Sequence, residues 1–226
     1  YRFGNNSLSG ARGVLTLQCL NNPCTSSVLV YEQSGGIWTS VQTITLAPPT
    51  GNNVERPFFT ALDGDRLAVA ISVPIGASID SRIVVRLYER PGAEFTFVRT
   101  IEPSAGSNII GVPLALRGDT LLLDDDSISS NGGVAIYQFS TGTHLQSLNV
   151  SGLTADDGFS SNLAMGANDR AVVGWPELDR SGYNNAGLIY TLELSSTRAT
   201  NSWGIVPVTG APLPDRLFSY FFEEDP

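Results

Sequence analysis

The chain has 226 residues, of which 42% are apolar and 15% charged, and its formal net charge is −9. This balance argues against a nucleic-acid or anionic-membrane surface, because a phosphate backbone must be met by Lys and Arg. All 13 basic residues are arginine, which excludes chemistry that needs a lysine amine. No stretch approaches the roughly 18 apolar residues of a membrane span. The 23 glycines and 13 prolines suit many short strands joined by tight turns.

The start of the chain, its two cysteines and its glycosylation sequons indicate a secreted protein. The chain begins at Tyr1 rather than Met, so we expect it to be processed or cut from a longer chain. Leu-Asn-Asn-Pro separates Cys19 from Cys24 and predicts a local disulfide, with two reduced, buried cysteines as the alternative. Two Asn-x-Ser sequons, at Asn5 and Asn149, predict N-glycosylation. Together these features indicate an oxidising, extracellular location.

One pattern recurs along the chain: a short apolar strand, a turn that contains Asp, and a second strand richer in Leu and Val. Its aspartates recur after 54 and 50 residues, and a degenerate copy opens the chain at residues 12–17. The three clear copies are Ala61–Ala70, Ala115–Leu123 and Ala164–Gly174.

A second landmark follows each copy, where a strand ends in an apolar residue and Tyr. These tyrosines recur after 57, 49 and 53 residues, and an alternating strand of half-buried type comes after them. An aromatic residue lies seven positions beyond the first two tyrosines; His144 fills this slot in the third copy, and Trp203 is its candidate in the fourth. The tyrosines are Tyr31, Tyr88, Tyr137 and Tyr190.

Each unit therefore holds about four strands in roughly 50 residues, and no segment predicts a helix longer than a turn. Such units are typical of β-propeller blades, because one sheet cannot bury both of its faces alone. We predict an all-β fold, a β-propeller with about four blades of four antiparallel strands. The predicted blades are 1–53, 54–107, 108–156 and 157–214, with 215–226 starting or closing a blade.

The units resemble the FG-GAP repeat, the family that includes the integrin-type propeller, in its variant of roughly 50 residues from large secreted proteins. Phe3-Gly4 is the intact name-giving pair; its counterparts are Ile110-Gly111 and Phe159-Ser160, and the second copy has Arg56-Pro57 instead. Gly174-Trp175-Pro176 echoes the Gly-Ala-Pro element. The resemblance covers nearly the whole chain and implies a propeller blade array.

The number of blades in the complete propeller stays open. We favour a chain that is part of a larger propeller. The alternative is a small closed ring, in which residues 218–222 pair beside the first blade.

Calcium-binding members of this family carry an Asp-x-Asp-x-Asp-Gly loop, whose alternate oxygens converge on the ion. Asp124 and Asp126 approach that spacing, but Ile128 occupies the next alternate position and has no oxygen ligand. We therefore favour a solvated acidic turn over a calcium site, and expect no other cofactor.

The sequence contains no Gly-x-Ser-x-Gly elbow and no His pair or Cys-His cluster for a metal. The only histidine, His144, occupies a slot that aromatic residues fill elsewhere, which favours packing over a general-base role. Acidic pairs such as Glu177 and Asp179 keep a carbohydrate-active enzyme as a third interpretation, since only the fold sets carboxylate separation. We predict that the protein is not an enzyme.

Trp175, Tyr183 and Trp203 fall in less regular segments, where exposed rings can stack on sugar faces. The competing interpretation places Trp175 in the core between blades. The insertion at residues 195–215 departs from the repeat and is the best place for a partner-specific surface. We predict a non-catalytic extracellular structural or adhesive module that contacts other protein chains or glycans in a larger secreted glycoprotein assembly. A sugar-binding lectin is the alternative.

Overall fold

The computed structural model describes ten segments of the chain, and only the backbone of 175, 188, 194–195 and 202–207. Within these segments there is no helix, and hence none that is long and apolar enough to cross a membrane. Asn149, Asp126, Tyr183 and residues 215–226 lie outside the described residues. The described segments are 1–20, 24–47, 54–75, 81–103, 113–124, 133–148, 162–166, 170–175, 188–195 and 202–207.

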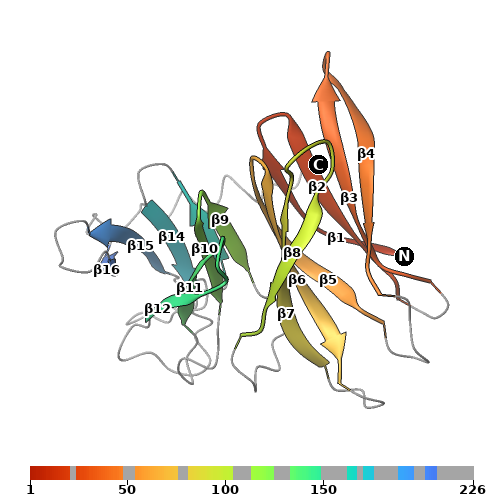
Figure 1. The fold of residues 1–226 in the computed structure, drawn as a ribbon. Helices are drawn as coiled ribbons and strands as arrows, with labels where there is room; N and C mark the ends of the chain where they lie inside the picture. Colours follow the sequence, from red (N-terminus) through yellow and green to blue (C-terminus); the bar gives the residue numbers. More distant parts are fainter. Residues whose placement is uncertain are drawn as a thin grey trace, which may run out of the picture.

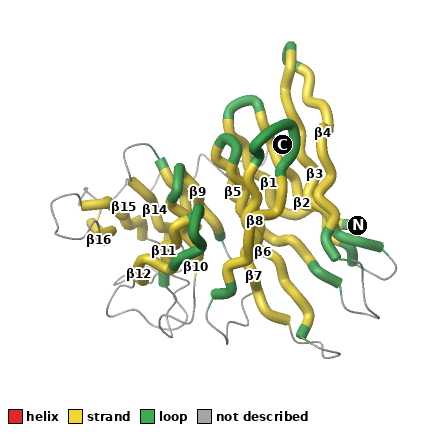
Figure 2. Tube along the Cα trace, in the orientation of Figure 1, coloured by secondary structure: helices red, strands yellow, loops and turns green. Residues whose placement is uncertain are grey.

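The described residues form four antiparallel sheets of four strands, and in each sheet the strands follow one another in chain order (Figure 2). The first sheet consists of β1 (Arg2–Ser9), β2 (Arg12–Gln18), β3 (Ser27–Ser34) and β4 (Ile37–Thr45). The second consists of β5 (Arg56–Asp63), β6 (Arg66–Pro74), β7 (Ser81–Glu89) and β8 (Thr96–Ile101). The third consists of β9 (Leu114–Arg117), β10 (Thr120–Asp124), β11 (Val134–Gln138) and β12 (His144–Leu148). The fourth consists of β13 (Asn162–Met165), β14 (Arg170–Trp175), β15 (Leu188–Ser195) and β16 (Ser202–Pro207).

The four sheets stand side by side in chain order, as propeller blades do (Figure 1). Their first strands are neighbours: β1 contacts β5, β5 contacts β9, and β9 contacts β13. The first and fourth sheets lie at opposite ends of this row, and no comparable contact joins their described strands (Figure 1). The predicted fold class, an all-β propeller of four-stranded blades, is therefore confirmed.

Buried apolar side chains fill the space between successive sheets. The core between the first and second sheets includes Val14, Val28, Val30, Leu67, Val69 and Ile71. The core between the second and third includes Ala68, Ala70, Val85, Leu121 and Leu123. The core between the third and fourth includes Leu122, Ile136, Ala171, Val173 and Leu192.

Strand β6 illustrates why the inner sheets have continuous apolar strands. Leu67 and Val69 belong to the core with the first sheet, whereas Ala68 and Ala70 belong to the core with the third. Successive side chains of a strand point to opposite faces, so a sheet covered on both faces needs apolar residues at every position. The stacking of the sheets thus explains the unbroken run Leu67–Ile71.

The recurring tyrosine has the same position in the strand register of the first three sheets. Tyr31 and Tyr88 lie opposite Gly13 and Leu67, the second residues of β2 and β6. A β-bulge precedes each of these tyrosines in its pairing with the fourth strand, and the third sheet repeats it at Tyr137. In the fourth sheet the residue opposite the second position of β14 is Leu192, so the predicted equivalence of Tyr190 is wrong by two residues.

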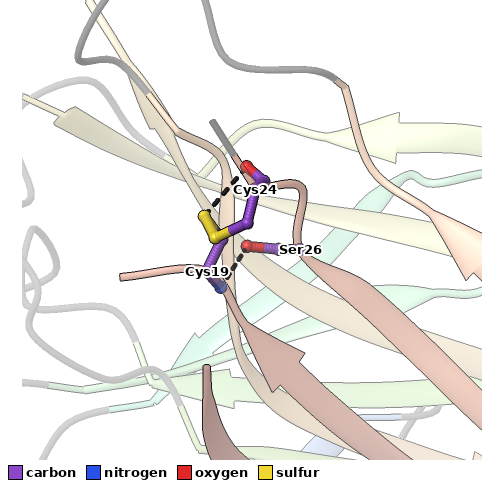
Figure 3. Close-up of a disulfide and its surroundings, with 3 residues drawn as sticks. All are labelled: Cys19, Cys24 and Ser26. Carbon is purple, nitrogen blue, oxygen red and sulfur yellow. Dashed lines mark hydrogen bonds between the residues drawn. A yellow bond between two sulfur atoms is a disulfide. The ribbon is translucent and has the colours of Figure 1, made fainter. Parts of the chain in front are cut away.

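The predicted disulfide between Cys19 and Cys24 is confirmed, and it links the segments that follow β2 and precede β3 (Figure 3). The two Cα atoms are 5.6 Å apart. The amide of Cys19 donates a hydrogen bond of 2.9 Å to Ser26 Oγ, and both groups are buried. The bridge therefore fixes one end of the first sheet.

Candidate functional site

The backbones of the two tryptophans predicted to bind sugar lie on two strands of the fourth sheet. The backbone of Trp175 pairs with Leu188 at the start of β15, and that of Trp203 pairs with Leu194 near its end. These partners are six positions apart on the strand, which corresponds to about 20 Å. The backbones of Trp175 and Trp203 therefore lie toward opposite ends of the fourth sheet, Tyr183 lies outside the described residues, and sugar binding stays a prediction.

The predicted metal and glycan positions are only partly described. Asp124 ends β10 and is buried, and its amide donates a hydrogen bond of 3.3 Å to Pro113 O. The described residues contain no group of three or more His, Cys, Asp or Glu side chains arranged to hold a metal. Asn5 is half-buried on β1, where its carbonyl accepts a hydrogen bond of 3.1 Å from Thr16. Calcium binding and glycosylation stay predictions.

His144 takes the place of a packing aromatic residue. Its ring meets Tyr137 edge-on at 5.2 Å, as Phe97 meets Tyr88 at 5.9 Å. In the strand register, His144 lies opposite Tyr137 just as Phe97 lies opposite Tyr88. His144 is therefore equivalent to Phe97, and not to Phe95 as the sequence spacing predicted. Nε2 of His144 is 2.9 Å from Ser147 Oγ.

A contact that the sequence analysis missed joins the first and second sheets through Arg12. This side chain donates hydrogen bonds to Gly64 O at 2.5 Å and to Asp65 Oδ1 at 2.9 Å, both in the first turn of the second sheet. Its guanidinium carbon also lies 5.6 Å from the centre of the Phe95 ring. On its own sheet, Arg12 is paired with Glu32 at 3.1 Å.

Arg66 repeats this contact between the second and third sheets. It donates to Gly118 O at 2.7 Å and to Asp119 Oδ1 at 3.1 Å, and its guanidinium carbon lies 5.2 Å from the centre of the Phe139 ring. On its own sheet, Arg66 is paired with Glu89 at 3.6 Å. We call this arrangement, built on Arg12 and on Arg66, the arginine clasp.

The turn glycines of the clasp have a conformational reason. Gly64 and Gly118 have φ of 57° and 53°, the left-handed region that residues with a Cβ rarely adopt. Each joins the first two strands of its sheet and offers its carbonyl to the arginine of the preceding sheet. The sequence signal for the clasp is an arginine just after this turn, at Arg12, Arg66 and Arg170.

Two carboxylates of the clasp, those of Asp119 and Glu32, have lowered pKa values. Burial alone raises the pKa of Asp119, but hydrogen bonds from Ser140 and Gln138 and the charge of Arg66 outweigh it, so the pKa is lowered from 3.8. The hydrogen bond from Arg12 lowers the pKa of Glu32 from 4.5, against a smaller effect of burial. Both groups are therefore anionic partners for arginine at neutral pH.

The outward face of the first sheet carries an apolar hollow of ≈ 270 Å³. Gly13 forms its floor, and a Cβ added to this glycine lies 2.7 Å from Leu8 and 3.6 Å from Trp38. Leu67 stands at the equivalent position of the second sheet, where it fills the core. The hollow thus exists because a glycine replaces a leucine. Its lining residues are Asn6, Leu8, Gly13, Val14, Leu15, Tyr31 and Trp38.

No protein-family model matches the chain, and no curated protein is a significant match to it. The resemblance to the FG-GAP repeat therefore stays a prediction, and the function is argued from the geometry.

Proposed function

We propose that this protein is a non-catalytic, extracellular structural or adhesive module, whose exposed sheet faces contact other chains of a secreted assembly. The observation that carries the proposal is the outward face of the first sheet, where Leu8 and Trp38 are exposed beside an apolar hollow. Exposed apolar patches of this kind mark interaction surfaces, because water contact with apolar atoms is unfavourable.

The stack of sheets supports a structural role. Its inner sheets are covered on both faces, and clasps and apolar cores join successive sheets, which suits a stiff support for a binding face. The disulfide between Cys19 and Cys24 supports an oxidising, extracellular location.

The chemistry of the hollow favours a protein partner over a glycan. The lining residues have three polar side-chain groups, those of Asn6 and Tyr31 and the indole N–H of Trp38, and none of them is charged. An interface core between proteins is rich in aromatic residues and poor in charge, as this face is. Sugar binding at the fourth sheet has less support, because the backbones of Trp175 on β14 and Trp203 on β16 pair with opposite ends of β15.

Binding of candidate partners to the immobilised chain tests the proposal. Beads carrying the folded chain are presented with purified secreted glycoproteins, with the glycans released from them, and with an oligosaccharide panel to detect hydrolysis. We expect binding to glycoproteins and its loss in Trp38→Ala. The matched control is Leu145→Ala on β12, because Leu145 is also exposed but lies on another sheet.

Binding to the free glycans that Trp175→Ala or Trp203→Ala abolishes would instead identify a lectin. Turnover of any oligosaccharide would identify an enzyme. Equal binding by wild type and Trp38→Ala would remove the first-sheet face from the proposal.

A further inference from the structure

The two end sheets carry opposite halves of the arginine clasp. We propose that the fourth sheet of one copy of this chain packs against the first sheet of a second copy, with Arg170 in the place of Arg12 and Arg66. This inference rests on the proposed function and names the partner of the first-sheet face.

The fourth sheet carries the donor half. Arg170 begins β14, as Arg12 and Arg66 begin β2 and β6, and it is paired with Glu193 on its own sheet at 3.1 Å. Its side chain is 67% exposed, compared with 17% for Arg12 and 30% for Arg66. The ion pair within the sheet is thus present, but the side chain of Arg170 is far more exposed than those of Arg12 and Arg66.

Two apolar residues of the fourth sheet are also more exposed than their equivalents in the first sheet. Val172 and Ile189 are exposed. By strand register they are equivalent to Val14 and Val28 of the first sheet, which are buried against the second sheet. Among the described residues, no further sheet packs on the outward face of the fourth sheet, which nevertheless carries the side chains of an interior face.

The first sheet carries the acceptor half. Gly10 has a φ of 59°, close to the 57° of Gly64, so its turn matches the one whose carbonyl receives Arg12. Thr39 lies opposite Glu32 as Thr96 lies opposite Glu89.

Trp38 precedes Thr39 as Phe95 precedes Thr96, so Trp38 holds the position of the clasp ring. Trp38 is 41% exposed and Leu8 70%, whereas their equivalents in the second sheet, Phe95 and Leu62, are 4% and 7% exposed. An arginine placed over Trp38 gains the cation–π contact that Arg12 makes with Phe95.

A second copy is the occupant because this chain itself carries both halves at faces that lie at opposite ends of the row (Figure 1). Ala11 stands in the first turn where Asp65 stands in the second, so the intermolecular clasp has the carbonyl and the ring but no turn carboxylate. Such an interface is head-to-tail, and it produces a ring if the rotation closes and a filament if it does not. Without the turn carboxylate, we expect the clasp between copies to be weaker than the clasps within one chain. Association is therefore expected only as the protein concentration rises.

Mixing two blocked variants tests the inference. Leu8→Asp blocks the first-sheet face, and Arg170→Glu blocks the fourth-sheet face. By sedimentation equilibrium, the wild type is expected to reach at least twice the mass of one chain as concentration rises, and each variant alone to stay a monomer. An equimolar mixture of the two variants is expected to form a dimer, because one intact face of each kind remains.

The milder variant Arg170→Ala is expected to raise the dissociation constant of self-association about tenfold, because the cation–π contact and the charge of the arginine are lost. Controls are Arg82→Ala, an exposed arginine of the second sheet paired with Glu102, and Leu145→Asp. Circular dichroism and thermal unfolding confirm that each variant is folded.

A wild-type chain that stays monomeric at millimolar concentration, or a variant mixture that does not associate, would overturn the inference. Monomers that still bind glycoproteins through Trp38 would leave the proposed function intact. Head-to-tail dimers that bind no glycoprotein would support the inference and confine the proposed adhesion to contacts between copies.

Discussion

The guanidinium of Arg66 on the second sheet lies 3.1 Å from the carboxylate of Asp119 on the third. Arg12 stands in the same relation to Asp65, at 2.9 Å, one sheet earlier. The repetition makes this contact part of the way the sheets are joined. Its consequences can be measured independently of the protein's function.

Replacing Arg66 by Ala is expected to lower the free energy of unfolding by about 1–2 kcal/mol, because a partly exposed ion pair and a cation–π contact are lost together. Chemical denaturation measures the change. Arg82→Ala removes an exposed arginine that is paired within one sheet, and it is expected to change stability by less than about 0.5 kcal/mol. Equal effects of the two substitutions would show that the clasp adds nothing to an ordinary surface pair.

Acid is expected to weaken the clasp. The folded pKa of Asp119 lies below its usual 3.8, so the stability it contributes is complete above that pH and is lost as the pH falls through the folded pKa. Glu32 acts in the same direction from its usual 4.5. The difference in stability between wild type and Asp119→Asn should therefore be largest near neutral pH and shrink as the pH falls below 3.8. A difference that is independent of pH would contradict this account.

The pair of Arg86 and Glu55 is expected to matter more than any surface pair. Arg86 donates two hydrogen bonds to the nearly buried Glu55 carboxylate, at 2.6 and 2.8 Å. That carboxylate also accepts the amide of Ala47 at 3.0 Å, which attaches the segment after the first sheet to the second. Glu55→Gln should lower the free energy of unfolding by about 2–3 kcal/mol, because Arg86 then keeps its charge without an anionic partner.

The matched control for this prediction is Glu102→Gln, which alters the exposed pair with Arg82. We expect the control to unfold at nearly the wild-type denaturant concentration. If the two variants unfold alike, the Arg86 pair is no more than a surface interaction.

Removing the disulfide should destabilise the chain moderately. The double variant Cys19→Ser, Cys24→Ser is expected to lose about 2 kcal/mol, because the bridge closes only a short loop and restricts the unfolded chain correspondingly little. A reducing agent should lower the stability of the wild type by a similar amount and leave the double variant unchanged. Sensitivity of the double variant to reductant would mean that the effect does not come from this bridge.

The repeat could be predicted from the sequence because its signals are local. Alternating residues, turns such as that at Gly64 and two nearby cysteines each act over a few positions. The clasp was missed because its partners, for example Arg12 and Asp65, are 53 residues apart. The position of Tyr190 was misjudged by two residues because strand register depends on pairing across the sheet.

By itself, the sequence determined that this chain forms four-stranded antiparallel units and it favoured a disulfide between Cys19 and Cys24, since neighbouring residues decide turns, alternation and a short loop. Only the tertiary structure decided which faces are covered and which stay open. Trp38 and Phe95 occupy equivalent positions in their sheets, yet one is exposed and the other buried, because in the described part of the chain the first sheet packs against another sheet on one face alone. The packing of whole sheets sets that difference, and no local pattern encodes it.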